Sequence, residues 1–188
     1  REVYDLTHGT TQRVNMVRAE GAPETDDVDV PTAYDNAGIV RRFFADVLNR
    51  NSIDSTGLDL ILNVHFATGY NNAFWDGDEM TFGDGDGVIF AGFPRSLDVV
   101  AHELAHGVTQ FTSGLVYKNE SGALNEHFSD VFGTTITQWA NGESPDEADW
   151  LIGDEIMGPQ LYGEALRSMR NPGTAYDNPT LGKDPQPA

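Results

Sequence analysis

The sequence contains no cysteine and few basic residues. Without cysteine, disulfide bonds, thiolate chemistry and Cys-ligated zinc are excluded. Only 11 Lys and Arg stand against 30 Asp and Glu, which gives a formal net charge of −19. Such an acidic surface repels phosphate backbones, so we expect no nucleic-acid partner. Carboxylates, in contrast, are suitable ligands for hard cations such as Ca2+.

Long apolar runs are also missing, and no stretch approaches the length of a membrane span, so we expect no membrane partner. The first residues, REVYDLTHGT, lack the pattern of a signal peptide and are compatible with the start of a processed enzyme. Twenty glycines, nine prolines and 39% hydrophobic residues in a chain of 188 indicate a loop-rich globular protein. We expect an α+β fold.

The first half of the chain predicts short strands around one helix. Residues 1–30 have the alternation and turn signals of strands and loops, with an acidic surface loop over 20–31. Helical spacing of apolar residues predicts a helix over 33–50. A buried strand is expected within 58–66, and short strands with tight glycine turns within 69–90.

The second half is more helical. The apolar pattern predicts one helix over 96–111, ended by Gly114, and a second over 121–140. A short helix is expected over 159–168. The proline-rich tail from Arg170 onward is expected to be irregular.

The stretch AHELAHGVTQ, residues 101–110, places two histidines four residues apart. On a helix His102 and His106 share one face and can present two ring nitrogens to one metal ion. Glu103 projects to the side, where it could take a proton from a water held by the metal. The same spacing also occurs without metal, and a catalytic zinc needs a third protein ligand.

The stretch NEHFSD, residues 125–130, offers that ligand. Glu126 and Asp130 are four apart and share a helix face, so Glu126 is the candidate third ligand. Asp130 and Asn125 can accept hydrogen bonds from the outer nitrogens of the two histidines and so orient the rings. His127 lies about 100° round the helix from Glu126 and is therefore not expected to be a ligand.

These residues carry a resemblance to a known family. VVAHELAHGVT together with YKNESGALNEHFSD closely resembles the thermolysin-like (M4) zinc metallopeptidases. GYNNAFWDGDEMTFGDGDG resembles the family's edge strand and turns, and LRSM, residues 166–169, resembles a segment with a substrate-binding arginine. The resemblance implies a β-rich N-terminal lobe with the HExxH helix over residues 1–115. The beginning of a helical C-terminal lobe would follow over 116–188, with zinc in the cleft between the two lobes.

The resemblance also implies a function. Family members are secreted endopeptidases that cut peptides and proteins before bulky apolar residues. The matching positions of this sequence are His102, His106 and Glu126 as zinc ligands, Glu103 as general base, Tyr117 at the oxyanion, Asp130 and Asn125 behind the ligands, and Asn72, Ala73 and Arg167 on the substrate.

The chain departs from the family in length. Relatives normally continue with further helices, which carry a histidine that helps to stabilise the transition state, whereas the last histidine here is His127. We therefore expect a chain that is incomplete relative to the family, with exposed core surface open to self-association or to a partner. This leaves a non-catalytic zinc-binding lobe as an alternative to an active peptidase. A third hypothesis, based on the negative charge, is an acidic binding module that is stabilised by calcium and whose histidines have no functional role.

Calcium ligands are only partly present. Relatives often have a bridging Glu where Thr137 stands, and another acid where Leu151 stands. A double calcium site is therefore not expected, but one Ca2+ is a candidate. Its candidate ligands are Asp98, Asp149 and Asp154 by their carboxylates and Glu147 by its carbonyl.

Two other features invite a metal interpretation. FGDGDG, residues 82–87, fails the spacing of an EF-hand loop, so tight turns are expected there. Nothing near His8 or His65 in the sequence completes a site, and both are expected to be ordinary core or surface histidines.

Overall fold

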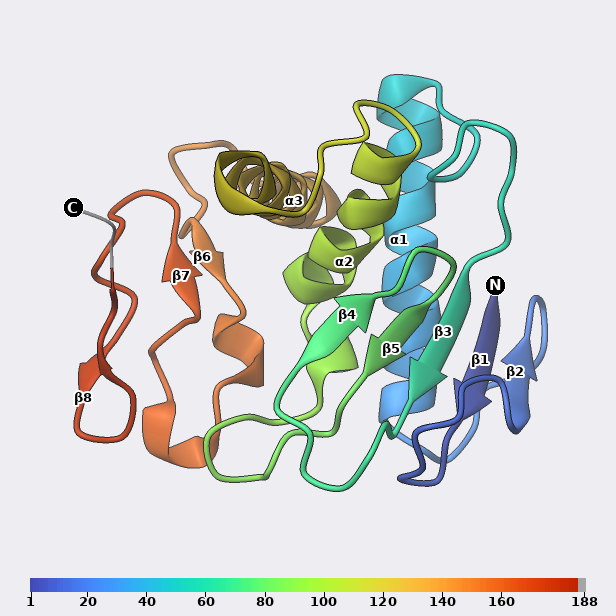
Figure 1. Ribbon diagram of the computed structural model, residues 1–188, viewed down its shortest axis with the longest axis horizontal. Helices are drawn as coiled ribbons and strands as arrows, with labels where there is room; N and C mark the ends of the chain where they lie inside the picture. Colours follow the sequence, from blue (N-terminus) through green and yellow to red (C-terminus); the bar gives the residue numbers. More distant parts are fainter. Residues whose placement is uncertain (186–188) are drawn as a thin grey trace.

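The structure is a computed structural model that describes residues 1–185, and it is an α+β fold with three long helices beside a five-stranded sheet (Figure 1). The helices are α1 (Asp29–Leu48), α2 (Leu97–Gln110) and α3 (Asn119–Asn141). The strands of the main sheet are β1 (Glu2–Asp5), β2 (Met16–Ala19), β3 (Ile61–Val64), β4 (Ala73–Trp75) and β5 (Met80–Phe82). Smaller elements are the 3-10 turns η1 (Phe93–Arg95), η2 (Asp154–Ile156) and η3 (Pro159–Leu161), and the two-residue strands β6 (Leu151–Ile152), β7 (Arg167–Ser168), β8 (Asp177–Asn178) and β9 (Gly182–Lys183).

The sheet has the order β2-β1-β3-β5-β4. The three inner strands run parallel to one another, and the outer strands β2 and β4 are antiparallel to their neighbours. In this order β4 is an edge strand, and it lies on the side of the sheet next to α2 (Figure 1). The outer main-chain groups of β4 are therefore available to another extended chain, except the N–H of Trp75, which donates to Glu103.

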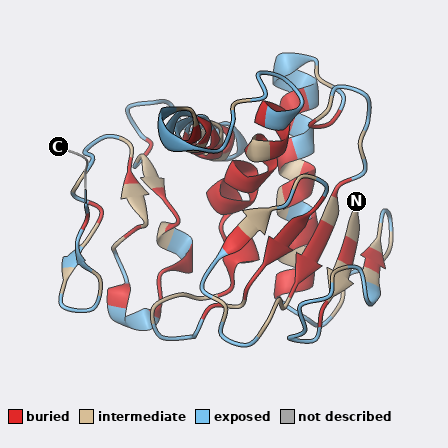
Figure 2. Ribbon diagram, viewed as in Figure 1, coloured by how far each residue is buried: buried red, intermediate tan, exposed pale blue. Residues whose placement is uncertain are grey.

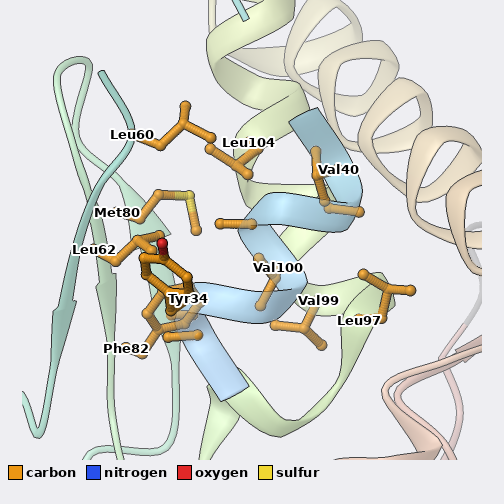
Figure 3. Packing of buried hydrophobic residues seen from close by; sticks show 14 of the residues in the cluster. Tyr34, Val40, Leu60, Leu62, Met80, Phe82, Leu97, Val99, Val100 and Leu104 are labelled. Carbon is orange, nitrogen blue, oxygen red and sulfur yellow. The ribbon is translucent and has the colours of Figure 1, made fainter. Parts of the chain in front are cut away.

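The main core lies between the sheet, α1 and α2. Val40 of α1, Leu62 of β3 and Leu104 of α2 are all fully buried in it (Figure 3). The helix α2 is buried on almost every side because it also packs against α3 (Figure 2). Burial of each large apolar side chain contributes about 1.5–3 kcal/mol, so this core fixes the position of α2 firmly.

The crossing of α2 and α3 depends on a glycine. A Cβ atom at Gly133 of α3 would lie 2.9 Å from the carbonyl oxygen of Asp98 on α2. That separation is shorter than a normal contact, so only a residue without a side chain allows the two helices to approach this closely. The approach brings the polar residues of α3 alongside those of α2.

The expected helices over 33–50, 96–111 and 121–140 correspond to α1, α2 and α3. The first begins earlier than expected, at Asp29, within the expected acidic loop. The carboxylate of Asp27 accepts hydrogen bonds from the N–H groups of Asp29 and Val30 and so satisfies the free donors of the first turn.

The prediction of a helix over residues 159–168 is wrong. The segment forms only the short turn η3 and then the strand β7, which pairs with β6. Gly163 has a φ of 90°, which is outside the helical region and stops the helix after one turn. The tail is also more regular than expected, because β8 and β9 form a small hairpin; residues 186–188 of the expected helical lobe lie outside the described residues.

Among the described residues, the structure has no helix that combines the length and the apolar character needed to cross a membrane.

Candidate metal centre and cleft

Two turns of α2 and one turn of α3 bring three ligand atoms together. The Nε2 atoms of His102 and His106 lie 3.1 Å apart. Oε2 of Glu126 lies 3.3 Å from Nε2 of His102, and Oε1 of Glu126 lies 3.5 Å from Nε2 of His106. Ligand atoms at about 2.0–2.1 Å from a tetrahedral zinc are separated from each other by about 3.3–3.4 Å. One ligand atom from each of the three side chains lies within 4.8 Å of the other two, so the three residues are close enough together to hold one zinc ion.

The outer nitrogens of both histidines have hydrogen-bond acceptors. Nδ1 of His102 donates to Asp130 at 2.8 Å, and Nδ1 of His106 donates to Asn125 at 2.7 Å. The hydroxyl of Ser129, which the sequence reasoning missed, lies 3.2 Å from the same Nδ1 of His106. With Nδ1 protonated, each ring directs the lone pair of Nε2 toward the other histidine and Glu126, as a metal ligand must.

The electrostatics of this cluster favour a cation. Burial by itself would lower the pKa of His102, but hydrogen bonds to Asp130 and Glu126 raise it to about 9. Burial would likewise raise the pKa of Glu126, but hydrogen bonds from His102 and Tyr117 and the nearby histidine charges lower it to about 2. A positive charge is thus stabilised here, either as a proton on His102 or as a metal ion held by all three side chains.

Glu103 lies beside the three ligand atoms on the buried side of the cleft. One carboxylate oxygen accepts a hydrogen bond of 3.1 Å from the backbone N–H of Trp75 in β4. Burial and, less strongly, the charge of Glu126 raise the pKa of Glu103, while the two histidines oppose the shift. A buried carboxyl with a raised pKa is suited to accept and return a proton.

Arg167 reaches the candidate metal centre from β7, where it pairs with Asp130. Its Nε and one terminal nitrogen both donate to Asp130 at 2.7 Å, in the two-pronged geometry that suits a carboxylate. Burial would raise the pKa of Asp130, but hydrogen bonds from His102 and Arg167 lower it to about 2. Arg167 therefore holds Asp130 ionised behind His102, a role that the sequence reasoning missed because the two residues lie 37 positions apart.

The metal centre opens into a cleft of about 580 Å³. Strand β4 and the turn after it line one side, and Tyr117 and Leu115 line another. One part of the lining is apolar and comes from Phe93, Val99, Ile152 and Leu166. Polar ligands beside an apolar recess are the usual composition of a small-molecule or peptide site.

The remaining substrate candidates also line this cleft. Tyr117 is exposed, and its hydroxyl donates a short hydrogen bond to Glu126. Asn72 is exposed just before β4, and its carbonyl accepts from the N–H of Gly83 at 3.0 Å. Ala73 is the buried first residue of β4. His127, as expected, is exposed and is not part of the cluster.

The calcium candidates do not form a comparable cluster. Within residues 1–185, only two groups of three His, Asp or Glu side chains bring ligand atoms within 4.8 Å of one another, and neither contains Asp98, Asp149, Asp154 or Glu147. Asp98 is buried and accepts hydrogen bonds from Ser96 and the N–H of Gly153, and burial raises its pKa to about 6. One Ca2+ stays a prediction.

The second group consists of Asp29, His65 and Asp84, with His8 beside it. Its members are already paired: Arg95 donates to Asp29 at 2.7 Å, and His65 contacts Asp84 at 2.8 Å and Asp27 at 3.2 Å. We interpret it as an ion-pair cluster. The FGDGDG segment begins at the end of β5 and continues as irregular chain that bends at Gly87, and Asp86 accepts hydrogen bonds from the N–H groups of Val88 and Ile89.

Comparison with known proteins shows the family of the chain. The family model described as thermolysin metallopeptidase, catalytic domain, matches residues 2–110, and the corresponding alpha-helical domain matches residues 113–187. An extracellular metalloprotease of Pectobacterium carotovorum subsp. carotovorum is 48% identical over 188 residues, which cover 100% of this chain and 54% of that protein. Thermolysin of Alicyclobacillus acidocaldarius subsp. acidocaldarius is 46% identical over 153 residues, covering 81% of this chain and 27% of that protein.

Among solved structures, the precursor of protealysin, a metalloproteinase from Serratia proteamaculans, superposes with a TM-score of 0.96 at 49% identity. The match covers 100% of this chain and 58% of that one, and the chain spans about half the length of the curated relatives that match it along its whole length. The ordered agreement over both parts identifies the chain as a member of the thermolysin metallopeptidase family.

Proposed function

We propose that the protein is a zinc endopeptidase in which His102, His106 and Glu126 hold the metal. The observation that carries the proposal is the convergence of the three side chains: the two Nε2 atoms lie 3.1 Å apart, and the two Glu126 oxygens lie 3.3 and 3.5 Å from one ring each, which suits a zinc ion. Asp130 and Asn125 support it by fixing the rings from behind. When bound, zinc is a Lewis acid that polarises a carbonyl group and lowers the pKa of a water molecule.

The side chains around the metal would move the protons. Glu103 accepts the proton of the attacking water and can pass it to the leaving amine, and its raised pKa suits both steps. Tyr117 donates its hydroxyl hydrogen to the developing oxyanion once it leaves Glu126. Arg167 is held at the cleft by Asp130 and faces the substrate with its remaining donors.

A peptide substrate would bind as an added strand. The free edge of β4 offers main-chain donors and acceptors, and Asn72 and Ala73 lie where that edge begins. The apolar recess formed by Phe93, Val99, Ile152 and Leu166 supports a preference for a bulky apolar residue after the cleaved bond.

We further propose that the protein is secreted, in keeping with the name of the Pectobacterium relative. We also propose that the chain divides into two lobes between residues 115 and 116.

Metal analysis tests the ligand set. Glu126→Ala should lose most of its bound zinc, because only two protein ligands remain. His127→Ala is the matched control. It removes a potential ligand from the adjacent, exposed position of α3, and this variant should retain a full equivalent of zinc. Equal zinc content in the two variants would refute the assignment.

A non-catalytic zinc-binding lobe is the second candidate, and one observation favours it. Leu124, Phe128 and Val131 form an exposed apolar stripe along α3, at 49%, 46% and 37% exposure. A continuous apolar stripe on a helix is normally covered by another surface. The stripe supports self-association of this chain.

A further inference from the structure

Trp75 of the edge strand β4 touches three residues of α2. Its backbone N–H donates to Glu103 at 3.1 Å, and its ring Nε1–H donates to the side chain of Gln110 at 2.9 Å. Between these contacts its ring lies over Gly107. Positions 103, 107 and 110 are spaced by four and three residues, so they share one face of the helix. One tryptophan therefore follows the helix face that carries the proposed general base.

Gly107 makes the close approach of the ring possible. A Cβ atom at this position would lie 3.2 and 3.3 Å from two atoms of the Trp75 ring and 2.8 Å from the side chain of Ile53. Any larger residue would push the ring away from α2. The Trp75 ring thus lies directly on the backbone of α2 at Gly107, one residue after the candidate ligand His106.

Gln110 binds the strand at two points. Its Oε1 accepts from Trp75, and its Nε2 donates to the carbonyl oxygen of Gly77 at 3.0 Å. Gly77 lies in the turn after β4 and has a φ of 108°, a conformation that favours glycine. The turn is closed by a hydrogen bond of 3.2 Å from the N–H of Asp76 to the carbonyl of Glu79. Gln110 therefore ties both the strand and its turn to the end of α2.

We propose that Gln110 is a positioning residue for peptide hydrolysis. It fixes β4 against α2, which keeps the N–H of Trp75 on Glu103 and sets the distance between the substrate edge and the metal centre. The proposal rests on the proposed function. Displacement by about 1 Å can lower an enzymatic rate by about 10²-fold, so the loss of the two Gln110 hydrogen bonds has a large effect on the rate.

The test replaces Gln110 by methionine, which has a similar length and cannot make either hydrogen bond. We expect kcat to fall by about 10-fold or more, KM to change less, and zinc content to stay the same. Gln138→Met on α3 makes the same chemical change away from the cleft and should keep the wild-type kcat. Gln110→Glu keeps an acceptor for Trp75 but cannot donate to Gly77. Its kcat should therefore lie between the values for Gln110→Met and Gln138→Met.

A double-mutant cycle separates positioning from a general loss of stability. Trp75→Phe removes the ring N–H, so Gln110→Met should lower kcat much less in that background than in the wild type. If Gln110 acted only on stability, the two changes would be additive in kcat below the unfolding temperature. Additive effects would overturn the proposal.

A second readout needs no activity. Exchange of the Trp75 backbone amide, followed by NMR, should be about 10-fold faster in Gln110→Met and unchanged in Gln138→Met. If the wild-type chain cleaves no peptide, the proposed function fails, but this measurement still decides whether Gln110 holds the strand. Unchanged protection of the Trp75 amide in Gln110→Met overturns the positioning role.

Discussion

At the scale of single residues, the geometry of the candidate metal centre is fixed by the groups behind the two histidines. Each imidazole is held through Nδ1, so that Nε2 points at Glu126. Asn125 also donates to the carbonyl of Leu115 at 3.3 Å, which ties the amide to the loop before α3. The ligand rings are therefore oriented before any metal binds, and this order should contribute to affinity.

Replacement of Asn125 tests this orientation. Asn125→Ala leaves all three ligands in place but removes the acceptor of His106, so we expect zinc affinity to fall by about 10–100-fold. Competition with a chromophoric chelator measures the change. Asn141→Ala, at the exposed end of the same helix, should bind zinc as the wild type does. Undiminished affinity of Asn125→Ala would show that the ring needs no such support.

His65 makes a prediction about pH. Its hydrogen bond to Asp84, supported by the charges of Asp84 and Asp27 and opposed by burial, raises its pKa from 6.5 to about 9. Because the folded pKa is the higher one, protonated His65 stabilises the fold fully below about pH 6.5. That contribution is lost as the pH rises through about 9.

Urea unfolding at about pH 7 and about pH 10 measures the effect. The free energy of unfolding should fall between the two pH values by more in the wild type than in His65→Gln. His127→Gln, a change at an exposed histidine, should behave as the wild type. Equal losses in His65→Gln and the wild type would contradict the raised pKa.

The sequence was sufficient for residues related by short spacings. His102 with His106, and Glu126 with Asp130, follow from the helical repeat alone, and the structure brings all four together. It was insufficient for contacts between distant segments. The pair Arg167 and Asp130, and the pair Gln110 and Trp75, depend on how β7 and β4 dock, which no local pattern encodes. The sequence contains one indication of a role for Gln110, because this residue lies on the same helix face as Glu103.

At the scale of elements, the site depends on the crossing of α2 and α3. Both helices were predicted from apolar periodicity, because each has a long repeat and a clear buried face. The helix predicted over 159–168 does not form, because the segment is short, its apolar pattern is interrupted, and Gly163 ends the helical turn. The exact crossing could not be predicted, because it depends on the space beside Gly133.

Substitution of Gly133 should disturb that crossing. Ala in place of Gly at an exposed helical position stabilises by about 1 kcal/mol, but here the added Cβ would meet the backbone of Asp98 at 2.9 Å. We expect Gly133→Ala to destabilise the protein by about 1–3 kcal/mol in urea unfolding, as overpacked sites do. Thr135→Ala, exposed on the same helix, should change stability little. A more stable Gly133→Ala variant would show that the helices can separate without cost.

At the scale of the whole molecule, two surfaces of the described residues differ in character: the cleft beside β4 and the stripe formed by Leu124, Phe128 and Val131 on α3. The cleft is lined by the candidate ligands and by both polar and apolar side chains, whereas the stripe carries large apolar side chains. The high negative charge opposes close association of two chains, and the stripe favours it. Salt, which screens the repulsion, should therefore promote association.

Sedimentation velocity measures this balance. We expect a concentration-dependent dimer that becomes stronger with salt and is weakened by the double change Leu124→Gln and Phe128→Gln. Tyr162→Ser removes a more exposed aromatic, at 93% exposure, from outside the stripe and should leave association unchanged. A wild-type monomer at all concentrations and salt levels would rule out self-association through α3.

The most direct test of the account is hydrolysis of a quenched peptide that carries a bulky apolar residue after the expected cleavage point. The wild type should cleave it, a zinc chelator should stop the reaction, and Glu103→Gln should lose activity while retaining a full equivalent of zinc. Cleavage by Glu103→Gln at the wild-type rate would contradict the role of Glu103. Absence of cleavage by the zinc-loaded wild type would contradict the peptidase and favour a zinc-binding lobe without activity of its own.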